Sequence, residues 1–181
     1  EIPGMVVINP CDDVEARAAV KAAYEYVGPV YLRFGRLAVP VLNDESTYKF
    51  EIGKGVKLKD GKDISIVATG LCVSEAVKAV DMLAADGIDA ELINIHTIKP
   101  IDEDIIVETA QKTGKVFTVE EHSIIGGLGS AVAEVLAEKC PTKLTRIGVR
   151  DRFGESGPAK ELLHKYELDA EGIYKQIKAA L

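Results

Sequence analysis

The 181-residue chain has only three cysteines, too few and too scattered for a framework of disulfides. Cys11, Cys72 and Cys140 lie far apart and follow none of the spacings of cysteine-based metal sites. An odd number of scattered cysteines is typical of reduced, buried thiols. The cysteines therefore predict a cytoplasmic protein that holds no metal through them.

Positive charge and long apolar runs are also lacking. The chain has 22 Lys and Arg against 29 Asp and Glu, a net charge of −7. Because phosphate backbones are bound by clustered Lys and Arg, no nucleic-acid partner is expected. No apolar run approaches the roughly 20 residues that cross a bilayer, and no signal peptide is recognisable. We therefore expect no membrane association.

What the chain does have is an alternation of strand-like and helix-like segments. Hydrophobic residues make up 47% of it, which is enough for a packed core. The first 36 residues predict one β-α-β unit: an apolar strand, an alanine-rich helix that Asp12 or Asp13 can cap, and a second strand at 30–35. Since the chain enters a strand directly after Glu1, we expect a fragment or a processed chain.

A new alternating series starts at Asp63, after a stretch that lacks periodicity. In that stretch, residues 49–61 favour a short hairpin or an edge ribbon. Four apolar strands separated by helices then predict an α/β fold, a three-layer and mostly parallel sheet with helices on both faces. The sequence thus predicts a β-α-β remnant of one α/β domain at 1–42, a linker or edge ribbon at 43–62, and a second α/β domain at 63–181.

The most distinctive polar residues, Glu120, Glu121 and His122, end the third strand of this second domain. Carboxylates beside a histidine can bind metal or move protons, and ligands of open α/β sheets bind at the carboxyl ends of strands. Neighbours on a strand point to opposite faces, so the three converge only if the chain turns there. The residues alone fit a polar strand end, a subunit or domain contact, or a ligand site.

A glycine-rich turn with Gly126, Gly127 and Gly129 leads from that strand into a helix. Such a loop can present backbone N–H groups to a phosphate. It is not a Gly-x-Gly-x-x-Gly fingerprint, and it lacks the Gly-Lys-Ser/Thr ending of a phosphate-binding loop. Close packing of strand against helix explains the glycines without a ligand, and we favour that interpretation.

Two arginines, Arg33 and Arg36, stand at the end of the strand VYLRFGR. Guanidinium groups can clamp a phosphate through bidentate, charge-assisted hydrogen bonds. The spacing fits a solvated or salt-bridged pair equally well. His96 and His164 have no evident catalytic partner, and the absence of a Gly-x-Ser-x-Gly elbow leaves hydrolase chemistry unsupported.

Together these motifs resemble those of the transketolase family. PGMVVINPCDDVEARAAVKAAYEYVGPVYLRFGR is similar to the final β-α-β of that family's pyrimidine-binding domain. VATG, INIHTIKPID, VEEHSIIGGLGSAV and DRFGESG then follow in the order of its C-terminal domain. The resemblance covers essentially the whole chain and is strongest to two-subunit transketolases, whose C-terminal subunit carries these two domains.

The resemblance implies an enzyme that uses thiamine diphosphate and Mg²⁺ to move a two-carbon ketol unit between sugar phosphates. The family's Gly-Asp-Gly metal motif and its adjacent asparagines are missing, since the only asparagines are Asn9, Asn43 and Asn94. The family's cofactor-activating glutamate belongs upstream of Glu1. The chain alone is therefore expected to bind neither cofactor nor metal and to be inactive, with no catalytic residue of its own.

The resemblance also assigns roles to the motifs. Arg36 falls on the family's sugar-phosphate arginine, and Arg33 is close enough to assist it. Because the family's C-terminal domain contributes mainly to dimer contacts, Glu120, Glu121, His122 and the three glycines of the turn are expected near an interface. The implied partners are an N-terminal transketolase section or subunit, a second copy, and sugar phosphates. Whether the missing domains share this polypeptide stays open.

Two other functions remain compatible with the sequence. Deoxyxylulose-phosphate synthases share the same domains and much of the VEE and glycine-turn motif, so the chain could be a fragment of such an enzyme. The second alternative is a stand-alone α/β regulatory module whose glycine turn holds a small anion.

Overall fold

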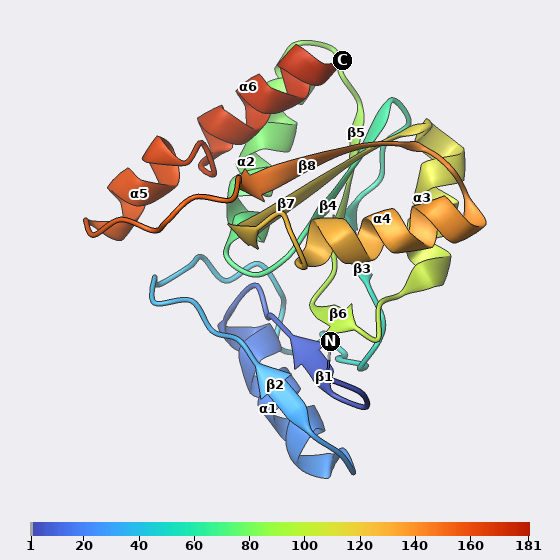
Figure 1. The fold of residues 1–181 in the computed structure, drawn as a ribbon, viewed down its shortest axis with the longest axis vertical. Coiled ribbons are helices and arrows are strands. Elements are labelled where there is room, and N and C mark those ends of the chain that lie inside the picture. The colour runs from blue at the N-terminus through green and yellow to red at the C-terminus, as the bar shows by residue number, and fades with distance from the viewer. Residues whose placement is uncertain (1) are drawn as a thin grey trace.

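Two sheets organise the computed structural model, which describes residues 2–181. The smaller sheet has the strand order β2-β1-β6, and the larger has the order β3-β5-β4-β7-β8 (Figure 1). The elements follow the chain as β1 (Val6–Ile8), α1 (Asp13–Glu25), β2 (Val30–Leu32), β3 (Val56–Lys59), β4 (Ile64–Ala68), α2 (Cys72–Ala85), β5 (Ala90–Asn94), β6 (Thr97–Lys99), α3 (Glu103–Thr113), β7 (Lys115–Ser123), α4 (Leu128–Lys139), β8 (Lys143–Val149), α5 (Ala159–Lys165) and α6 (Ala170–Ala180).

The first unit is the predicted β-α-β. β1 and β2 pair in parallel, and buried Val6 and Ile8 on β1 pack against Ala19 of α1. Asp12 caps α1, because its carboxylate accepts a hydrogen bond from the Glu15 N–H at 2.8 Å. The strand β6 was not predicted. It leaves the second unit and pairs antiparallel with β1, so the two units share a sheet.

The second unit confirms the predicted mostly parallel sheet. β5, β4, β7 and β8 run parallel to one another, and β3 pairs antiparallel with β5 at the edge. Of the two expectations for residues 49–61, the edge ribbon is correct and the hairpin is wrong, since only β3 is extended there. Its pairing partner lies further along the chain, where a local turn pattern gives no signal.

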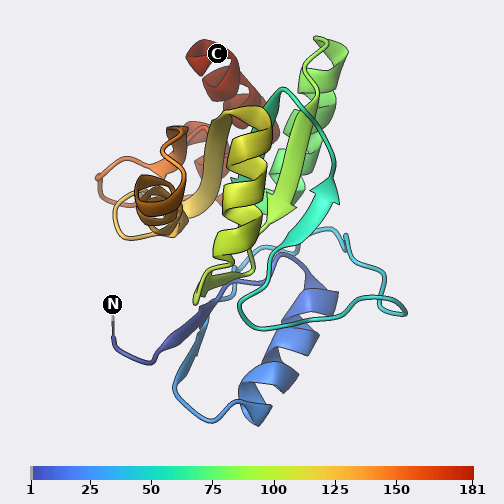
Figure 2. The ribbon, with the colours of Figure 1, turned by 90° about the vertical axis from the view of Figure 1, so that its right-hand side faces the viewer.

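Helices cover both faces of the larger sheet (Figure 2). Ile64 and Ile66 of β4 lie in one hydrophobic cluster with residues of α2 and α6, whereas Val67 lies in another with residues of α3 and α4. This alternation is the period of two expected of a strand, although every residue of β4 is buried. The three-layer α/β architecture is therefore confirmed. No described helix combines the length and apolarity that crossing a membrane would require.

A buried glutamate, Glu15 on α1, joins the two units. Its carboxylate accepts hydrogen bonds from the Cys11 N–H at 2.6 Å, the Tyr48 hydroxyl at 2.5 Å and the Asn94 side-chain amide at 2.8 Å. These donors come from the first unit, the following connection and the end of β5. Burial and the nearby Glu15 charge raise the pKa of Tyr48, so its hydroxyl stays a donor.

The connection between the units is held at further points. The second carboxylate oxygen of Asp12 accepts hydrogen bonds from the backbone N–H groups of Leu42 and Asn43, both at 2.8 Å. Further along, the rings of Phe50 and buried His96 lie 4.3 Å apart. Burial lowers the pKa of His96, which favours its neutral form. The segment at 42–50 thus binds both units.

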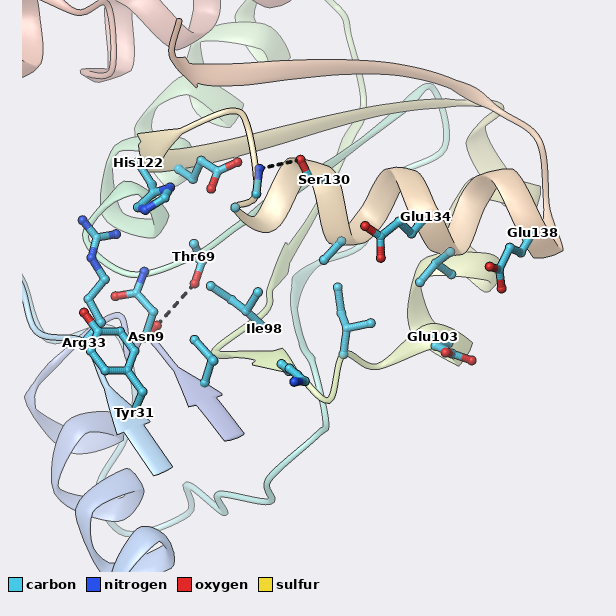
Figure 3. A pocket seen from close by; sticks show the side chains of 18 residues that line it. Asn9, Tyr31, Arg33, Thr69, Ile98, Glu103, His122, Ser130, Glu134 and Glu138 are labelled. Atoms are coloured by element: carbon cyan, nitrogen blue, oxygen red, sulfur yellow. Dashed lines mark hydrogen bonds between the residues drawn. The ribbon is translucent and has the colours of Figure 1, made fainter. Parts of the chain in front are cut away.

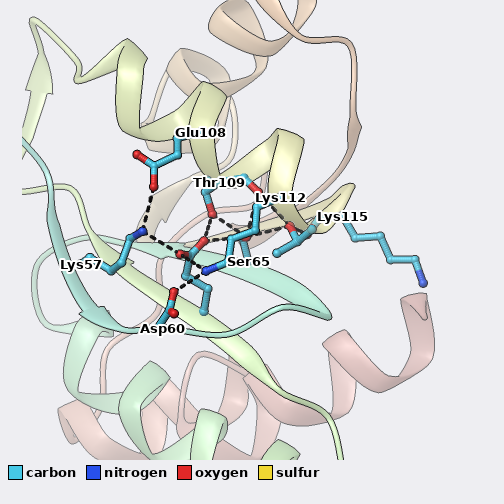
Figure 4. Close-up of polar contacts among 9 residues, drawn as sticks. Lys57, Asp60, Ser65, Glu108, Thr109, Lys112 and Lys115 are labelled. Carbon is cyan, nitrogen blue, oxygen red and sulfur yellow. Dashed lines mark hydrogen bonds and ion pairs between the residues drawn. The ribbon is translucent and has the colours of Figure 1, made fainter.

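A second buried acid, Glu91 on β5, is bonded to Thr109 and Lys112 of α3, which Figure 4 shows with Lys57 close by. The amino groups of Lys57 and Lys112 each lie 3.1 Å from one carboxylate oxygen, and the Thr109 hydroxyl donates to the other. Burial alone would raise the pKa of Glu91. The hydrogen bonds from Thr109, Lys112 and Lys57 outweigh burial and hold that pKa below its ordinary value.

Replacing Glu15 by Ala is expected to lower the free energy of unfolding by roughly 3–5 kcal/mol, because it leaves two buried donors and the partly buried Tyr48 hydroxyl without an acceptor. Tyr48→Phe removes one donor and should cost about 1–2 kcal/mol. The matched control is Glu25→Ala on the exposed surface of the same helix, expected to change the free energy by less than about 0.5 kcal/mol. Urea unfolding measures all three, and equal effects of Glu15→Ala and Glu25→Ala would contradict the assigned role.

The Glu91 cluster predicts a dependence of stability on pH. Because the folded pKa lies below the ordinary value of 4.5, ionised Glu91 stabilises the fold above that pH, and this contribution disappears as the pH falls through the folded pKa. Glu91→Gln should therefore be less stable than the natural chain at pH 7 by about 1–3 kcal/mol. The difference should shrink as urea unfolding is repeated towards pH 3. A difference independent of pH would show that the ionised carboxylate is not what stabilises the cluster.

Candidate functional site

A cleft of about 500 Å³ lies between the two units, beside the carboxyl ends of β4 and β7. One wall comes from the end of β1 and from β2, and the other from the β7–α4 connection and α4 (Figure 3). Of the polar and charged residues that line it, the first unit supplies Asn9, Tyr31 and Arg33, and the second unit supplies Thr69, Lys99, Glu103, Glu120, His122, Ser130, Glu134 and Glu138. This is the edge of a parallel sheet at which ligands usually bind.

Glu120, at the end of β7, is buried and caps the helix α4. One carboxylate oxygen accepts a hydrogen bond from the Leu128 N–H at 2.7 Å, and the other from the Gly129 N–H at 2.8 Å. The helix has Gly127 as its N-cap residue and so has no side-chain cap of its own. Burial raises the pKa of Glu120, although the two N–H groups favour its charged form. The strand therefore supplies the anion that the helix N-terminus attracts.

The glycines of the turn make this close approach possible. A Cβ on Gly127 would lie 2.0 Å from a carboxylate oxygen of Glu120. A Cβ on Gly129 would lie 2.8 Å from both Thr118 Oγ1 and Arg146 Cδ. The favoured interpretation, close packing of strand against helix, is therefore confirmed for these two positions.

The amides that would bind an anion at the glycine turn already donate hydrogen bonds within the chain. The Leu128 and Gly129 amides donate to Glu120, and the Gly126 amide donates to the Ser130 hydroxyl at 2.9 Å. An external phosphate at this helix N-terminus would have to displace a buried carboxylate. The turn is consequently a poor anion site in this chain.

The three polar residues at the end of β7 do not converge on one point. Glu120 is directed to α4, whereas the Glu121 backbone carbonyl accepts a hydrogen bond from Arg33 Nη2 at 2.8 Å. The Glu121 carboxylate lies 3.9 Å from the same nitrogen. Burial raises the pKa of Glu121, opposed by the charge of Arg33. His122 is exposed and lines the cleft, and its Nδ1 lies 3.0 Å from the Ser123 carbonyl.

These positions bear on the residues expected near an interface. Glu120, Gly127 and Gly129 are buried inside the chain, and Glu121 is partly covered. His122 and Gly126 are exposed, as is the neighbouring Ile125. Any partner at this surface would therefore touch the tip of the turn, with the buried residues supporting it from below.

The two arginines are in different surroundings. Arg33 lines the cleft and is bonded to β7, whereas Arg36 lies on the loop after β2, exposed and outside the cleft lining. Among residues 2–181, no hydrogen bond or ion pair holds the Arg36 side chain. Of the pair expected to act together, only Arg36 has its full set of donors free.

Sequence reasoning missed Asn9 and Thr69 as residues of the cleft. The Thr69 hydroxyl donates to the Asn9 backbone carbonyl at 3.3 Å, which joins the two walls (Figure 3). The sequence did point to Asn9 and Thr69, because each is a polar residue directly after a buried strand. This signal was weak, since many such residues only end a strand.

The described residues offer no ready-made cluster of metal ligands. Within residues 2–181, no group of three or more His, Cys, Asp or Glu side chains could hold a metal ion. Asn43 and Asn94 are used inside the chain, where they donate to Asp12 and Glu15. No step through the cofactor is therefore assigned to a residue of this chain.

Comparison with known proteins identifies the family. Residues 53–173 match the family described as "Transketolase, C-terminal domain". A putative transketolase C-terminal section from Methanocaldococcus jannaschii is 49% identical over 97% of this chain and 55% of that protein. A 6-deoxy-6-sulfo-D-fructose transketolase subunit from Clostridium sp. strain MSTE9 is 46% identical over 96% of this chain and 54% of that protein. A 1-deoxy-D-xylulose-5-phosphate synthase from Syntrophotalea carbinolica is 40% identical over 98% of this chain and 28% of that protein.

The fold is shared as well as the sequence. A solved split-gene transketolase, described as an inactive β4 tetramer, has a TM-score of 0.94 and 48% identity, covering 99% of this chain and 58% of that one. The chain spans about half the length of the transketolase relatives it matches. On both sequence and fold, this chain belongs to the transketolase family and carries its C-terminal domain.

Proposed function

We propose that this chain is the C-terminal part of a transketolase, a thiamine-diphosphate-dependent transferase that moves a two-carbon ketol unit between sugar phosphates. The observation that carries the proposal is similarity along nearly the whole chain to proteins described as a transketolase C-terminal section or subunit. When bound, the cofactor supplies the carbanion chemistry, with Mg²⁺ at its diphosphate. Residues beyond this chain would hold both.

In this proposal Arg36 binds the phosphate of the sugar. Its side chain is exposed and unengaged within residues 2–181, on a loop at the carboxyl end of a parallel strand. A guanidinium presents a fixed fork of donors that matches phosphate oxygens and stays charged at any physiological pH. Arg36 would thus orient the substrate and take no part in proton transfer.

The proposed partners are an N-terminal transketolase section or subunit and a second copy of the chain. One relative is described as a subunit, and the structural neighbour is described as a β4 tetramer. The tip of the β7–α4 turn, at His122, Ile125 and Gly126, is the exposed part of the region we expect near an interface. Without an N-terminal section, the chain would assemble but would lack the cofactor site.

A second function deserves a test because deoxyxylulose-phosphate synthases match nearly the whole chain. An assay with pyruvate as donor would test for such an enzyme. The relatives described as a transketolase subunit or section are 42–49% identical, against 38–40% for the synthases. On that difference we favour transketolase.

Arg36→Ala in the complete enzyme should raise KM for phosphorylated sugars about thirtyfold, the equivalent of roughly 2 kcal/mol for a charge-assisted contact. KM for unphosphorylated sugars should stay unchanged, because they have no group for Arg36 to bind. Steady-state kinetics with both substrates measure the split. Arg17→Ala is the control and should leave both KM values unaltered, since this exposed arginine on α1 pairs, among residues 2–181, with Asp13 and Glu45 alone. An equal rise for both kinds of sugar would refute the phosphate role.

The isolated chain should show no ketol transfer and no tight binding of thiamine diphosphate with Mg²⁺ in calorimetric titration. Addition of an N-terminal transketolase section should restore turnover with a phosphorylated ketose as donor. Turnover by the chain alone would contradict the proposal. Activity of the reconstituted enzyme with pyruvate, but not with a ketose phosphate, would establish the synthase alternative instead.

A further inference from the structure

The side chain of Arg33, directly after β2, points away from the loop that follows it. It extends along the cleft towards β7, beside His122 (Figure 3). Its Nη2 donates to the Glu121 carbonyl at 2.8 Å, and the Glu121 carboxylate lies 3.9 Å from the same atom. A charged donor on a carbonyl makes a stronger bond than a neutral one, and the side chain is only 31% exposed. This contact therefore fixes the position of Arg33.

The bond belongs to a line of contacts between the two units. The Asn9 N–H donates to the His96 carbonyl at 2.8 Å, and the Thr69 hydroxyl donates to the Asn9 carbonyl at 3.3 Å. The Arg33 N–H itself donates to the Ile8 carbonyl at 2.8 Å, at the end of β1. Arg33 is thus held by its backbone to the first unit and by its side chain to the second.

The loop that carries Arg36 starts at this point. Beyond Arg33, a Cβ on Gly35 would lie 3.4 Å from the Leu71 side chain, so the loop runs in contact with the start of α2. Val39 then packs against the hydrophobic cluster beneath α2. Arg36 lies between these two attachments, and its backbone position depends on both.

We propose that Arg33 is a positioning residue: its bond to the Glu121 carbonyl fixes the loop that presents Arg36 to the sugar phosphate, and Arg33 does not bind the phosphate itself. The inference rests on the proposed function, because it requires Arg36 to be the phosphate ligand. Arg33 and Arg36, alike in chemistry and three positions apart, would thus have different roles.

A double-mutant cycle in the complete enzyme tests this. Arg33→Met keeps the length of the side chain and removes the donors, and Arg36→Ala removes the phosphate ligand. Arg33→Met alone should raise KM for a phosphorylated sugar about threefold to tenfold, as expected for one misplaced hydrogen-bonding group. In the Arg36→Ala background it should raise that KM by less than about twofold. Inhibition by inorganic phosphate should follow the same pattern.

If Arg33→Met fails to fold, Arg33→Lys replaces it, since lysine keeps a charged donor for the Glu121 carbonyl. Its effect on KM should be smaller than that of Arg33→Met and should again nearly vanish in the Arg36→Ala background. Equal factors in both backgrounds would show that Arg33 binds phosphate directly and would overturn the inference while leaving the proposed function intact. No effect of Arg33→Met in either background would overturn it too. If Arg36→Ala leaves KM unchanged, the phosphate role of Arg36 fails, and the inference about Arg33 fails with it.

Discussion

The carboxylate of Glu15 is the group on which the relation between the two units depends. It is buried and, among residues 2–181, lies beside no cation, so hydrogen bonds from Cys11, Tyr48 and Asn94 must compensate its charge. These donors come from the first unit, the connection and the larger sheet. Separating the units would leave a buried carboxylate short of donors, a change that costs several kcal/mol. The hydrogen bonds of this one carboxylate thus help to hold the units together, beside the pairing of β1 with β6.

This arrangement decides what the residues at the end of β2 can do. With β1 and β6 paired, the end of β2 faces the end of β7, and Arg33 reaches the Glu121 carbonyl. Three residues later the chain has turned along the start of α2, and Arg36 has no partner within residues 2–181. The difference between the two arginines therefore comes from the packing of the units, not from the side chains.

The sequence predicts the position of an element well where the hydrophobic period is strong. β4, β7 and the helix α4 lie where the apolar spacing and the glycine turn predict them. β6 was missed because Thr97–Lys99 has no apolar period, and its pairing depends on β1, far away along the chain. The burial of Glu15 was equally hidden, since a glutamate on an alanine-rich helix is typical of a solvated face. For the site, the rule of strand ends located Glu120 and His122 at the cleft. It could not separate Arg33 from Arg36, because that separation is a matter of distances between remote segments.

The glycine turn shows how a helix N-terminus at the usual ligand edge can be closed to ligands by its own fold. Its amides carry partial positive charge and would attract a phosphate. Glu120 occupies that position, and the small size of Gly127 and Gly129 lets the strand come close enough to do so. Burial raises the pKa of Glu120 and the two N–H groups oppose that shift; the carboxyl oxygens and the amides of the helix end satisfy one another inside the core. Arg36, on the first unit, has by contrast no hydrogen bond or ion pair within residues 2–181, and its loop passes close to Leu71 at the start of α2.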